Sequence, residues 1–408
     1  MKPDLALTDA ERYPLLTKNG QEMLRRLREH PCAPRYNHIC GDRMNTAALE
    51  RVRLFEKEVM AQTGTAHAGA PNASKIPEWL SRFAEFCLAD VPFYRCRGGS
   101  AIDLQSIPAC SREDLSREFW SFVPDSQPLD DMIVYATSGT TGHPLTILSH
   151  PETSSRYLPL LRLALARRGI TLEGGPSRVS IVLVCMQQST YTYASLMSYL
   201  GEAGFLKINL HPQQWRNEAD RARFLDDCAP EIYTGDPISF EELATLPLRT
   251  RPKALLSTAM TLLPALRDRL EAHFSCPVID VYSNNEAGLI AAGSNEQSGH
   301  QLLPPDLHVE ILRPDDTPCA PGERGEITLS GGRNPFLPLL RYRTGDWASL
   351  DFGGSIASLI DLSGRAPTIF TSPAGHRINN IDVTAALKPF ALSQFRLHQT
   401  ADGVLHLQ

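Results

Sequence analysis

The sequence predicts an α/β protein with a large N-terminal domain of parallel sheet covered by helices, a β-rich subdomain, and a short, truncated C-terminal segment. Between residues 132 and 282, short apolar runs alternate with amphipathic helical stretches, which is typical of a parallel sheet with helices on its faces. After about residue 298 the strands continue without helices between them. The 408 residues, 42% apolar and 21% charged, are enough for a sizeable core and exclude a disordered chain.

We expect four parts along the chain. They are a helical N-terminal region of the large domain (1–125), an α/β core (126–298), a β-rich subdomain (299–363), and a hinge with part of a C-terminal domain (364–408). In the first part, apolar residues recur at helical spacing in 21–30, 47–62 and 77–88. Ser111 and Asp114 form a capping box that opens a further short helix.

The α/β core follows from the alternation of strands and helices. Expected strands are 132–136, 179–185, 205–209, 231–234, 254–256 and 278–282; expected helices are 153–168, 191–203, 219–228, 238–243 and 263–274. In the β-rich part we expect strands at 307–312, 325–329, 347–350 and 356–362, and in the tail one helix at 381–390. Ligands bind at the carboxyl ends of parallel strands, so the loops that follow strands are the places to look for chemistry.

Net charge and cysteine content limit the possible binding partners and the cellular compartment. A net charge of −6 gives no footprint for nucleic acid or an anionic membrane, and no apolar stretch approaches the ~20 residues that span a bilayer. The first residues lack the basic start and apolar run of a signal peptide. Nine cysteines without a CxxC pair indicate reduced thiols, so we expect a cytoplasmic protein. Cys32, His38 and Cys40 could form part of a metal site, but buried thiols and a surface histidine are the simpler interpretation.

A glycine- and hydroxyl-rich loop follows the first strand of the core. Its two glycines allow a sharp turn, and its hydroxyls and exposed N–H groups suit phosphate oxygens. The spacing and the lysine of a Walker loop are absent, and the alternative is an ordinary surface turn. The candidate phosphate-binding residues are Thr137, Ser138, Gly139, Thr140, Thr141 and Gly142.

Three later segments add candidate ligand-binding groups. Glu286 offers a hard oxygen for Mg²⁺, and Tyr282 a flat face for a purine; the alternative is a capped helix start with an exposed acid. Asp346, in Arg341-Tyr-Arg-Thr-Gly-Asp346, could bind the two hydroxyls of a ribose, although a surface ion-pair cluster explains it equally. Arg365 could reach a phosphate or ribose, or be a solvated arginine on a turn.

The order and spacing of these motifs resemble the adenylate-forming enzyme superfamily, and within it the phenylacetate-CoA ligase-like branch. The branch is indicated by the segments 91–94, 107–115, 230–237 and 321–327, and the resemblance extends from about residue 76 to 385. It implies that ATP adenylates a carboxylic acid, an aryl or related acid in our expectation, with release of pyrophosphate. A thiol, coenzyme A or that of a carrier protein, then takes the acyl group. Another acceptor (an amine, a carrier protein or a cofactor) and a non-catalytic nucleotide-binding module are the alternatives, and a homodimer is left open.

The resemblance also assigns roles to residues. Thr137 to Gly142 would hold the β- and γ-phosphates, Glu286 Mg²⁺, Tyr282 the adenine, Asp346 the ribose, and Arg365 ribose or phosphate. Asn285 would donate to the α-phosphate. Further nucleotide contacts are expected from Thr258, Ala259 and Ser283, and the acid pocket from Tyr135, Ala136, Tyr191, Tyr193 and Ser257. Ordinary core aromatics are an equal alternative for Tyr191 and Tyr193.

The sequence departs from the family pattern in four places. His143 stands where lysine is usual, and Ser283 and Asn285 replace a glycine and a hydroxyl residue. The residues after Arg365 lack the usual acidic residues and glycine turn, so the hinge residue is not fixed. The tail is about half the length of the family's mobile domain and has no distal lysine in the expected place. This predicts a truncated sequence, slow adenylation, or a partner that supplies the missing charge.

Overall fold

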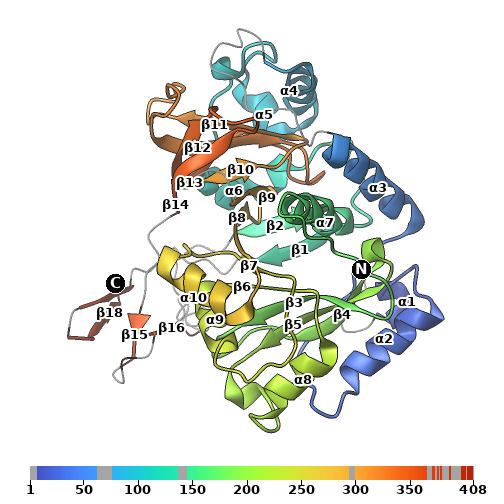
Figure 1. Cartoon of the computed structure of the whole chain (residues 1–408). Helices are drawn as coiled ribbons and strands as arrows, with labels where there is room; N and C mark the ends of the chain where they lie inside the picture. The colour runs from blue at the N-terminus through green and yellow to red at the C-terminus, as the bar shows by residue number, and fades with distance from the viewer. Residues whose placement is uncertain are drawn as a thin grey trace.

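The structure is a computed structural model that describes residues 7–61, 76–136, 145–293, 299–364, 370–372, 375, 377–378, 386, 397–400 and 402–407. Its main element is a mixed sheet of twelve strands with helices packed against it, and the predicted α/β class is confirmed (Figure 1). In the part of the chain that is described, no helix combines the length and the apolar character needed to cross a membrane.

One half of the sheet is parallel. Its strands are β3 (Val179–Cys185), β4 (Tyr193–Met197), β5 (Ala203–Asn209), β6 (Ile232–Gly235), β7 (Ala254–Ser257) and β8 (Val278–Asn284). They lie in the order β8-β7-β6-β3-β5-β4, and all neighbours are parallel except β4, which runs antiparallel to β5 at the edge. Nearly every side chain of β3 is buried, as expected of a strand covered on both faces.

Helices cover both faces of this half. One face carries α2 (Lys18–Arg28), α8 (Asp220–Cys228), α9 (Pro237–Leu243) and α10 (Pro264–Phe274), and the other α3 (Thr46–Ala61) and α7 (Pro151–Ala166). Local sequence determines where α9 begins: the Asp236 carboxylate caps its N-terminus, and Pro237 is its first helical residue. A four-residue helix, α1 (Asp9–Arg12), precedes these helices.

The predicted helix at residues 191–203 is wrong. This segment forms β4, a single 3-10 turn (Ser198–Leu200) and the first residue of β5. Its apolar residues fit either periodicity, and pairing with β5, from Tyr193 opposite Lys207 to Met197 opposite Ala203, decides for the strand.

The other half of the sheet is antiparallel and shares β8 with the first. Its further strands are β9 (Gly288–Gly293), β10 (His300–Leu302), β11 (Leu307–Leu312), β12 (Gly325–Gly331), β13 (Leu339–Asp351) and β14 (Ser358–Ser363), in the order β11-β12-β13-β14-β10-β9-β8. A core of buried residues joins it to α4 (Glu78–Asp90), α5 (Pro92–Arg97), α6 (Arg112–Glu118) and the 3-10 turns Leu104–Ser106 and Phe119–Phe122.

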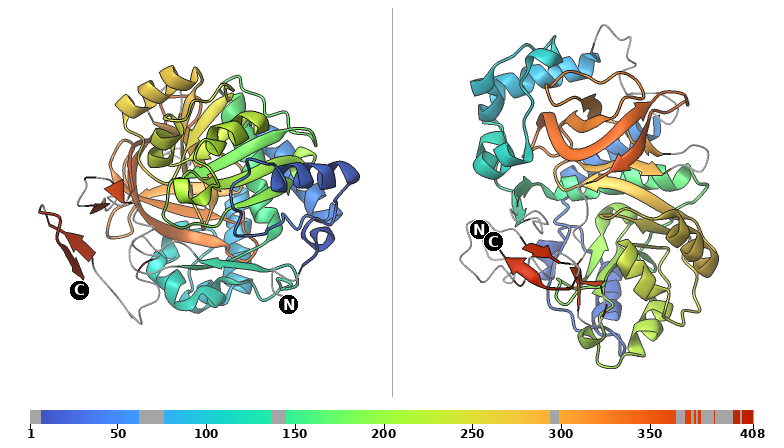
Figure 2. Two further views of the ribbon diagram at one scale, coloured as in Figure 1. Left: turned by 90° about the horizontal axis from the view of Figure 1, so that it is seen from below. Right: turned by 90° about the vertical axis from the view of Figure 1, so that its left-hand side faces the viewer.

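Among the described residues, three two-stranded sheets lie outside the large sheet. The strand expected at 132–136 as the first of the parallel sheet is β1 (Ile133–Ala136), which instead pairs antiparallel with β2 (Thr146–Ser149) in a separate hairpin. Near the C-terminal end, β15 (Phe370–Thr371) pairs with β16 (Arg377–Ile378), and β17 (Leu397–Gln399) with β18 (Leu405–Leu407). Both pairs lie to one side of the main body (Figure 2). The helix expected at 381–390 lies outside the described residues except for residue 386.

Candidate active site

The candidate site lies where the turn between β8 and β9 meets β13. Glu286, in this turn, is only 5% exposed, and its Oε1 accepts two hydrogen bonds. The Tyr342 hydroxyl donates one at 2.8 Å, and Nη1 of Arg112 donates the other at 3.1 Å. The carboxylate charge is therefore balanced by an ion pair that joins the first residue of α6 to the β8–β9 turn.

The sequence of the turn explains this geometry. The Asn284 side chain accepts a hydrogen bond from the Ala287 N–H at 2.7 Å, and Gly288 takes a φ of +76° that other residues rarely adopt. The chain can then reverse directly from β8 into β9. The alternative of a capped helix start at this motif is wrong, because the motif forms a tight β-turn.

Tyr282 and Asp346 are hydrogen bonded to each other. The Tyr282 hydroxyl donates to Oδ2 of Asp346 at 2.9 Å. Burial and the Asp346 charge raise the pKa of Tyr282 above its ordinary value, so the phenol stays protonated and remains a donor. The backbone N–H of Asp346 donates to the Thr344 hydroxyl, which in turn donates to the Ile327 carbonyl. The residues proposed for adenine and for ribose are thus adjacent, and the backbone of Asp346 is linked to β12 through Thr344.

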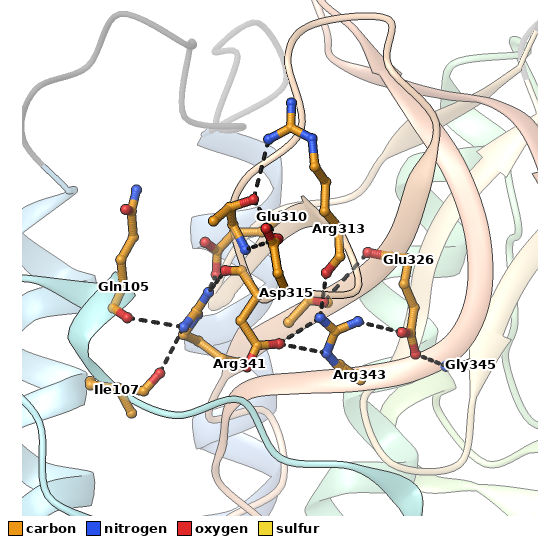
Figure 3. Close-up of polar contacts among 12 residues, drawn as sticks. Gln105, Ile107, Glu310, Arg313, Asp315, Glu326, Arg341, Arg343 and Gly345 are labelled. Carbon is orange, nitrogen blue, oxygen red and sulfur yellow. Dashed lines mark hydrogen bonds and ion pairs between the residues drawn. The ribbon is translucent and has the colours of Figure 1, made fainter.

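The two arginines of the same motif have structural partners. Arg341 is buried and donates to the backbone carbonyls of Gln105, Ile107 and Asp316 (Figure 3). Arg343 donates to the carboxylates of Asp316 and Glu326. These contacts tie the segment after α5 and the β11–β12 connection to β13. A surface ion-pair cluster was the alternative considered for this motif. The two arginines do form ion pairs, but Arg341 is buried and not at the surface.

The strand that leads into the predicted phosphate loop touches the same turn. The Tyr135 hydroxyl, on β1, donates to the Asn285 carbonyl at 3.2 Å. Burial, and next the charge of Glu286, raise the pKa of Tyr135 to about 12. The following residues lie outside the described part of the chain, so their predicted roles stay predictions; they are Thr137, Ser138, Gly139, Thr140, Thr141, Gly142 and Arg365.

Other predicted residues lie at the neighbouring strand end. Ser257 ends β7 beside β8 and is fully buried, and its hydroxyl has no partner among the described residues. The Thr258 N–H donates to the Gly235 carbonyl, and Ala259 has a positive φ of 66°, so the backbone turns sharply here. Burial raises the pKa of the partly buried Tyr157 of α7, and interaction with the Ser283 side chain opposes this rise, which places Ser283 next to α7. The carboxyl ends of β6, β7 and β8 therefore lie side by side at one end of the parallel strands.

Tyr191 and Tyr193 lie elsewhere. Their rings pack against His38, with centroids 4.9 Å and 5.8 Å away, next to β4 at the sheet edge. Four strands separate β4 from β8, which corresponds to roughly 24 Å at about 4.8 Å per strand. The structure does not bring these two tyrosines to Glu286, whereas it does bring Tyr135 and Asn285 there.

Two residues of the site were not among the predicted site residues. Arg112 carries only the signal of a helix start, because it follows the capping residue Ser111. Tyr342 lies inside a motif whose aspartate and arginines draw attention first. The one available signal is alternation, which puts Tyr342 on the opposite face of β13 from Arg341 and Arg343.

The donor set fits Mg²⁺ and offers little to softer metals. Proteins bind Mg²⁺ through one or two carboxylates together with substrate phosphates, and Glu286 is a buried carboxylate with Oε2 not used by the two donors above. Within the described residues no three His, Cys, Asp or Glu side chains gather as metal ligands. This covers Cys32, His38 and Cys40, considered above as part of a metal site.

Two characterised proteins are similar to this chain in sequence. No protein-family model matches the chain. Phenylacetate-coenzyme A ligase of Escherichia coli (strain K12) is 23% identical over 287 residues, which are 64% of this chain and 63% of that protein. Protein CapK of Staphylococcus aureus is 21% identical over 259 residues, 61% of this chain and 54% of that protein. The matches therefore span less than two thirds of either relative.

A solved structure extends the likeness to the fold. The open conformation of 2-hydroxyisobutyryl-CoA ligase, crystallised with 2-HIB-AMP and CoA, superposes with a TM-score of 0.55 at 18% identity. The superposition covers 81% of this chain and 82% of the other. The two chains share one fold over most of their length.

Proposed function

We propose that this chain, whose sequence and fold are those of an adenylate-forming enzyme of the phenylacetate-CoA ligase-like branch, activates a carboxylic acid with ATP and transfers the acyl group to a thiol such as coenzyme A. The observation that carries the proposal is the buried carboxylate of Glu286 beside the Tyr282–Asp346 pair and at the end of β1. A metal-binding oxygen, a carboxylate for a ribose and the strand before a phosphate-type loop then belong to one site.

In the proposed reaction, a carboxylate oxygen of the acid attacks the α-phosphorus of ATP and the bond to the β-phosphate oxygen breaks. Pyrophosphate leaves, and an acyl-adenylate remains. The thiolate then attacks the acyl carbon and AMP leaves. Both partners of the first step are anions, so the protein has to align them and balance charge rather than supply a covalent group. Mg²⁺ held by Glu286 would neutralise phosphate charge.

The residues of the site would divide this work. Asp346, held by Tyr282 and Thr344, would accept hydrogen bonds from the ribose hydroxyls and so fix the nucleotide. Asn285 and the loop from Thr137 to Gly142 would donate to the phosphates, and Arg365 would contact ribose or phosphate. Ser283, Thr258 and Ala259 would line the nucleotide from the ends of β8 and β7. The acid would lie near Tyr135, Ala136 and Ser257.

The relatives support the same chemistry. One is named for phenylacetate and coenzyme A, and the solved ligase was crystallised with an acyl-adenylate and CoA. We propose an aryl or related acid as substrate. The nine cysteines, all described, are unpaired, which suits the cytoplasm, where thiols stay reduced.

Acid-dependent exchange of labelled pyrophosphate into ATP tests the proposal. The acids should include phenylacetate, benzoate and short hydroxy acids, each with Mg²⁺. We expect exchange with at least one aryl acid and a fall of about 10²–10³-fold in Glu286→Gln, because a preorganised charge is lost. Nucleotide binding without exchange for any acid would support a binding module. Exchange without thioester formation would indicate another acceptor.

A matched control separates chemistry from folding. Glu231 is buried to a similar degree, but it binds Lys253, Ser180 and two backbone N–H groups just before β6 begins, at the opposite edge of the parallel strands. Glu231→Gln should lower stability and leave exchange per folded molecule unchanged. Equal exchange in Glu286→Gln and wild type would overturn the assignment of Glu286.

A further inference from the structure

We infer that Arg112 is the resident counterion of Glu286 and competes with the metal ion of a metal–nucleotide complex for this carboxylate. The inference rests on the proposed function, and it concerns how binding of metal and nucleotide are coupled at the site. It gives the N-terminal helical region a part in the nucleotide site, through one side chain at the start of α6.

The geometry makes Arg112 a fixed cation. It is the first residue of α6, and the capping box of Ser111 and Asp114 holds that end of the helix. Asp114 also pairs with Arg97, and Leu115 of the next turn is buried. The Arg112 side chain is 22% exposed and its guanidinium is 3.1 Å from the 5% exposed Glu286. An ion pair this sheltered is screened less by solvent than a surface pair.

Tyr342 separates the effect of charge from that of hydrogen bonding. It donates to the same oxygen, Oε1, as Arg112 does, but it is neutral. Burial and the negative charge of Glu286 raise the pKa of Tyr342 well above its ordinary value, so it remains a neutral donor. The two donors thus differ mainly in charge.

The competition follows from Coulomb's law. A divalent ion on Oε2 would lie within a few ångströms of the guanidinium on Oε1, and like charges at that distance repel strongly where solvent is scarce. With Arg112 in place, Glu286 has its charge balanced before any metal arrives. Without Arg112, a buried unpaired carboxylate would face the phosphates of metal-free ATP, and it would bind the metal complex in preference.

The measurable quantity is the ratio of two dissociation constants for ATP, one in EDTA and one in excess Mg²⁺. This ratio reports the coupling between metal and nucleotide, and calorimetry gives it without turnover. In Arg112→Gln we expect the ratio to rise about five- to tenfold over wild type, because the competing cation is gone. Arg112→Lys, which keeps the charge, should stay close to wild type.

Tyr342→Phe is the matched control. It removes a donor from the same oxygen and leaves the charge in place, so the ratio should stay within about twofold of wild type. A ratio in Arg112→Gln that is unchanged or lower would overturn the inference. An equal rise in Tyr342→Phe would overturn it too, because it would trace the effect to carboxylate position.

A second variant covers the case in which Arg112→Gln does not fold. Arg112→His is charged at pH 5.5 and largely neutral at pH 8. At pH 5.5 the ratio of the two dissociation constants for Arg112→His should equal that of wild type, and at pH 8 it should exceed the wild-type ratio. The same value relative to wild type at both pH values would count against the inference. If wild-type protein binds neither form of ATP, the proposed function fails first. If wild-type protein binds ATP and the Arg112 variants have the same ratio of dissociation constants as wild type, the competition is refuted and the proposed function still stands.

Discussion

Strand β13 presents two rows of polar side chains, and the rows have different kinds of partner. Tyr342 and Asp346 bond to Glu286 and Tyr282, at the turn where β8 passes into β9. Arg341 and Arg343 bond to backbone carbonyls and carboxylates of the antiparallel half and of the segment after α5 (Figure 3). One six-residue motif therefore contributes to a candidate binding site and to the scaffold behind it.

The difference lies in how the charges are satisfied. Arg341 is 1% exposed, and its terminal nitrogens are used on three backbone carbonyls. On the other face, the charge of Glu286 is met by an arginine from a distant helix and by a neutral tyrosine. Groups whose donors are used within the scaffold hold its shape, whereas Glu286 keeps one carboxylate oxygen that neither Arg112 nor Tyr342 uses.

The largest expected effect is on stability, from Arg341→Met. The change leaves the buried carbonyl of Ile107 and the part-buried carbonyls of Gln105 and Asp316 without this donor. It also leaves the carboxylate of Glu310, 3.9 Å away, without its counter-charge. We expect a loss of about 4 kcal/mol in the free energy of unfolding, measured by denaturant titration. ATP affinity of the folded fraction should be unchanged.

The control is Arg95→Met, whose ion pair with Asp125 is exposed and should cost at most about 0.5 kcal/mol. A stable Arg341→Met protein that has lost ATP binding would mean that both faces of β13 belong to the site.

A pH-dependent effect of slightly smaller size is expected at His308. This residue of β11 is 7% exposed, and strand alternation puts it on the same face as Glu310. Burial lowers its pKa to about 4. Between pH 6.5 and about 4 the unfolded chain therefore binds a proton that the folded chain does not, so stability is complete above pH 6.5 and falls below it.

On going from pH 7 to pH 4, His308 alone should lower the free energy of unfolding by up to about 3 kcal/mol. The measurement is the free energy of unfolding of wild type and His308→Leu at pH 7, 6, 5 and 4, and the difference between the two proteins isolates the histidine. Parallel curves for the two proteins would show that His308 accepts a proton in the folded state as readily as in the unfolded one.

The parallel strands could be predicted from the sequence because burial on both faces leaves a continuous apolar run, as in β3. β4 could not, because its apolar residues fit a helix and a strand equally and only its partner β5 decides. The β1–β2 hairpin was missed for a similar reason: its runs resemble strands of the main sheet, and nothing local indicates which strand will be the neighbour.

The candidate site divides in the same way. Glu286 and Asp346 are recognisable because each lies in a short motif with a chemical role. Arg112 reaches Glu286 across a long sequence separation, and no spacing rule predicts such a contact. Alternation separates Tyr342 from Arg341 and Arg343, but it does not say which face meets the β8–β9 turn. That depends on how α6 and β13 pack.

The smallest expected effect comes from Tyr282→Phe and sharpens the comparison on the site face. The change removes the hydroxyl that holds Oδ2 of Asp346 and keeps the ring in place. A typical hydrogen bond contributes about 1 kcal/mol, so we expect ATP affinity to fall about fivefold, measured by calorimetry, because Asp346 is no longer held for the ribose. The free energy of unfolding should change by at most about 1 kcal/mol.

Tyr233→Phe is the control. This tyrosine of β6 is also buried, but its hydroxyl has no partner among the described residues, and its loss should leave ATP affinity unaltered. A higher ATP affinity in Tyr282→Phe would mean that the hydrogen bond withholds Asp346 from the nucleotide, and that this face is closed until a ligand breaks the pair.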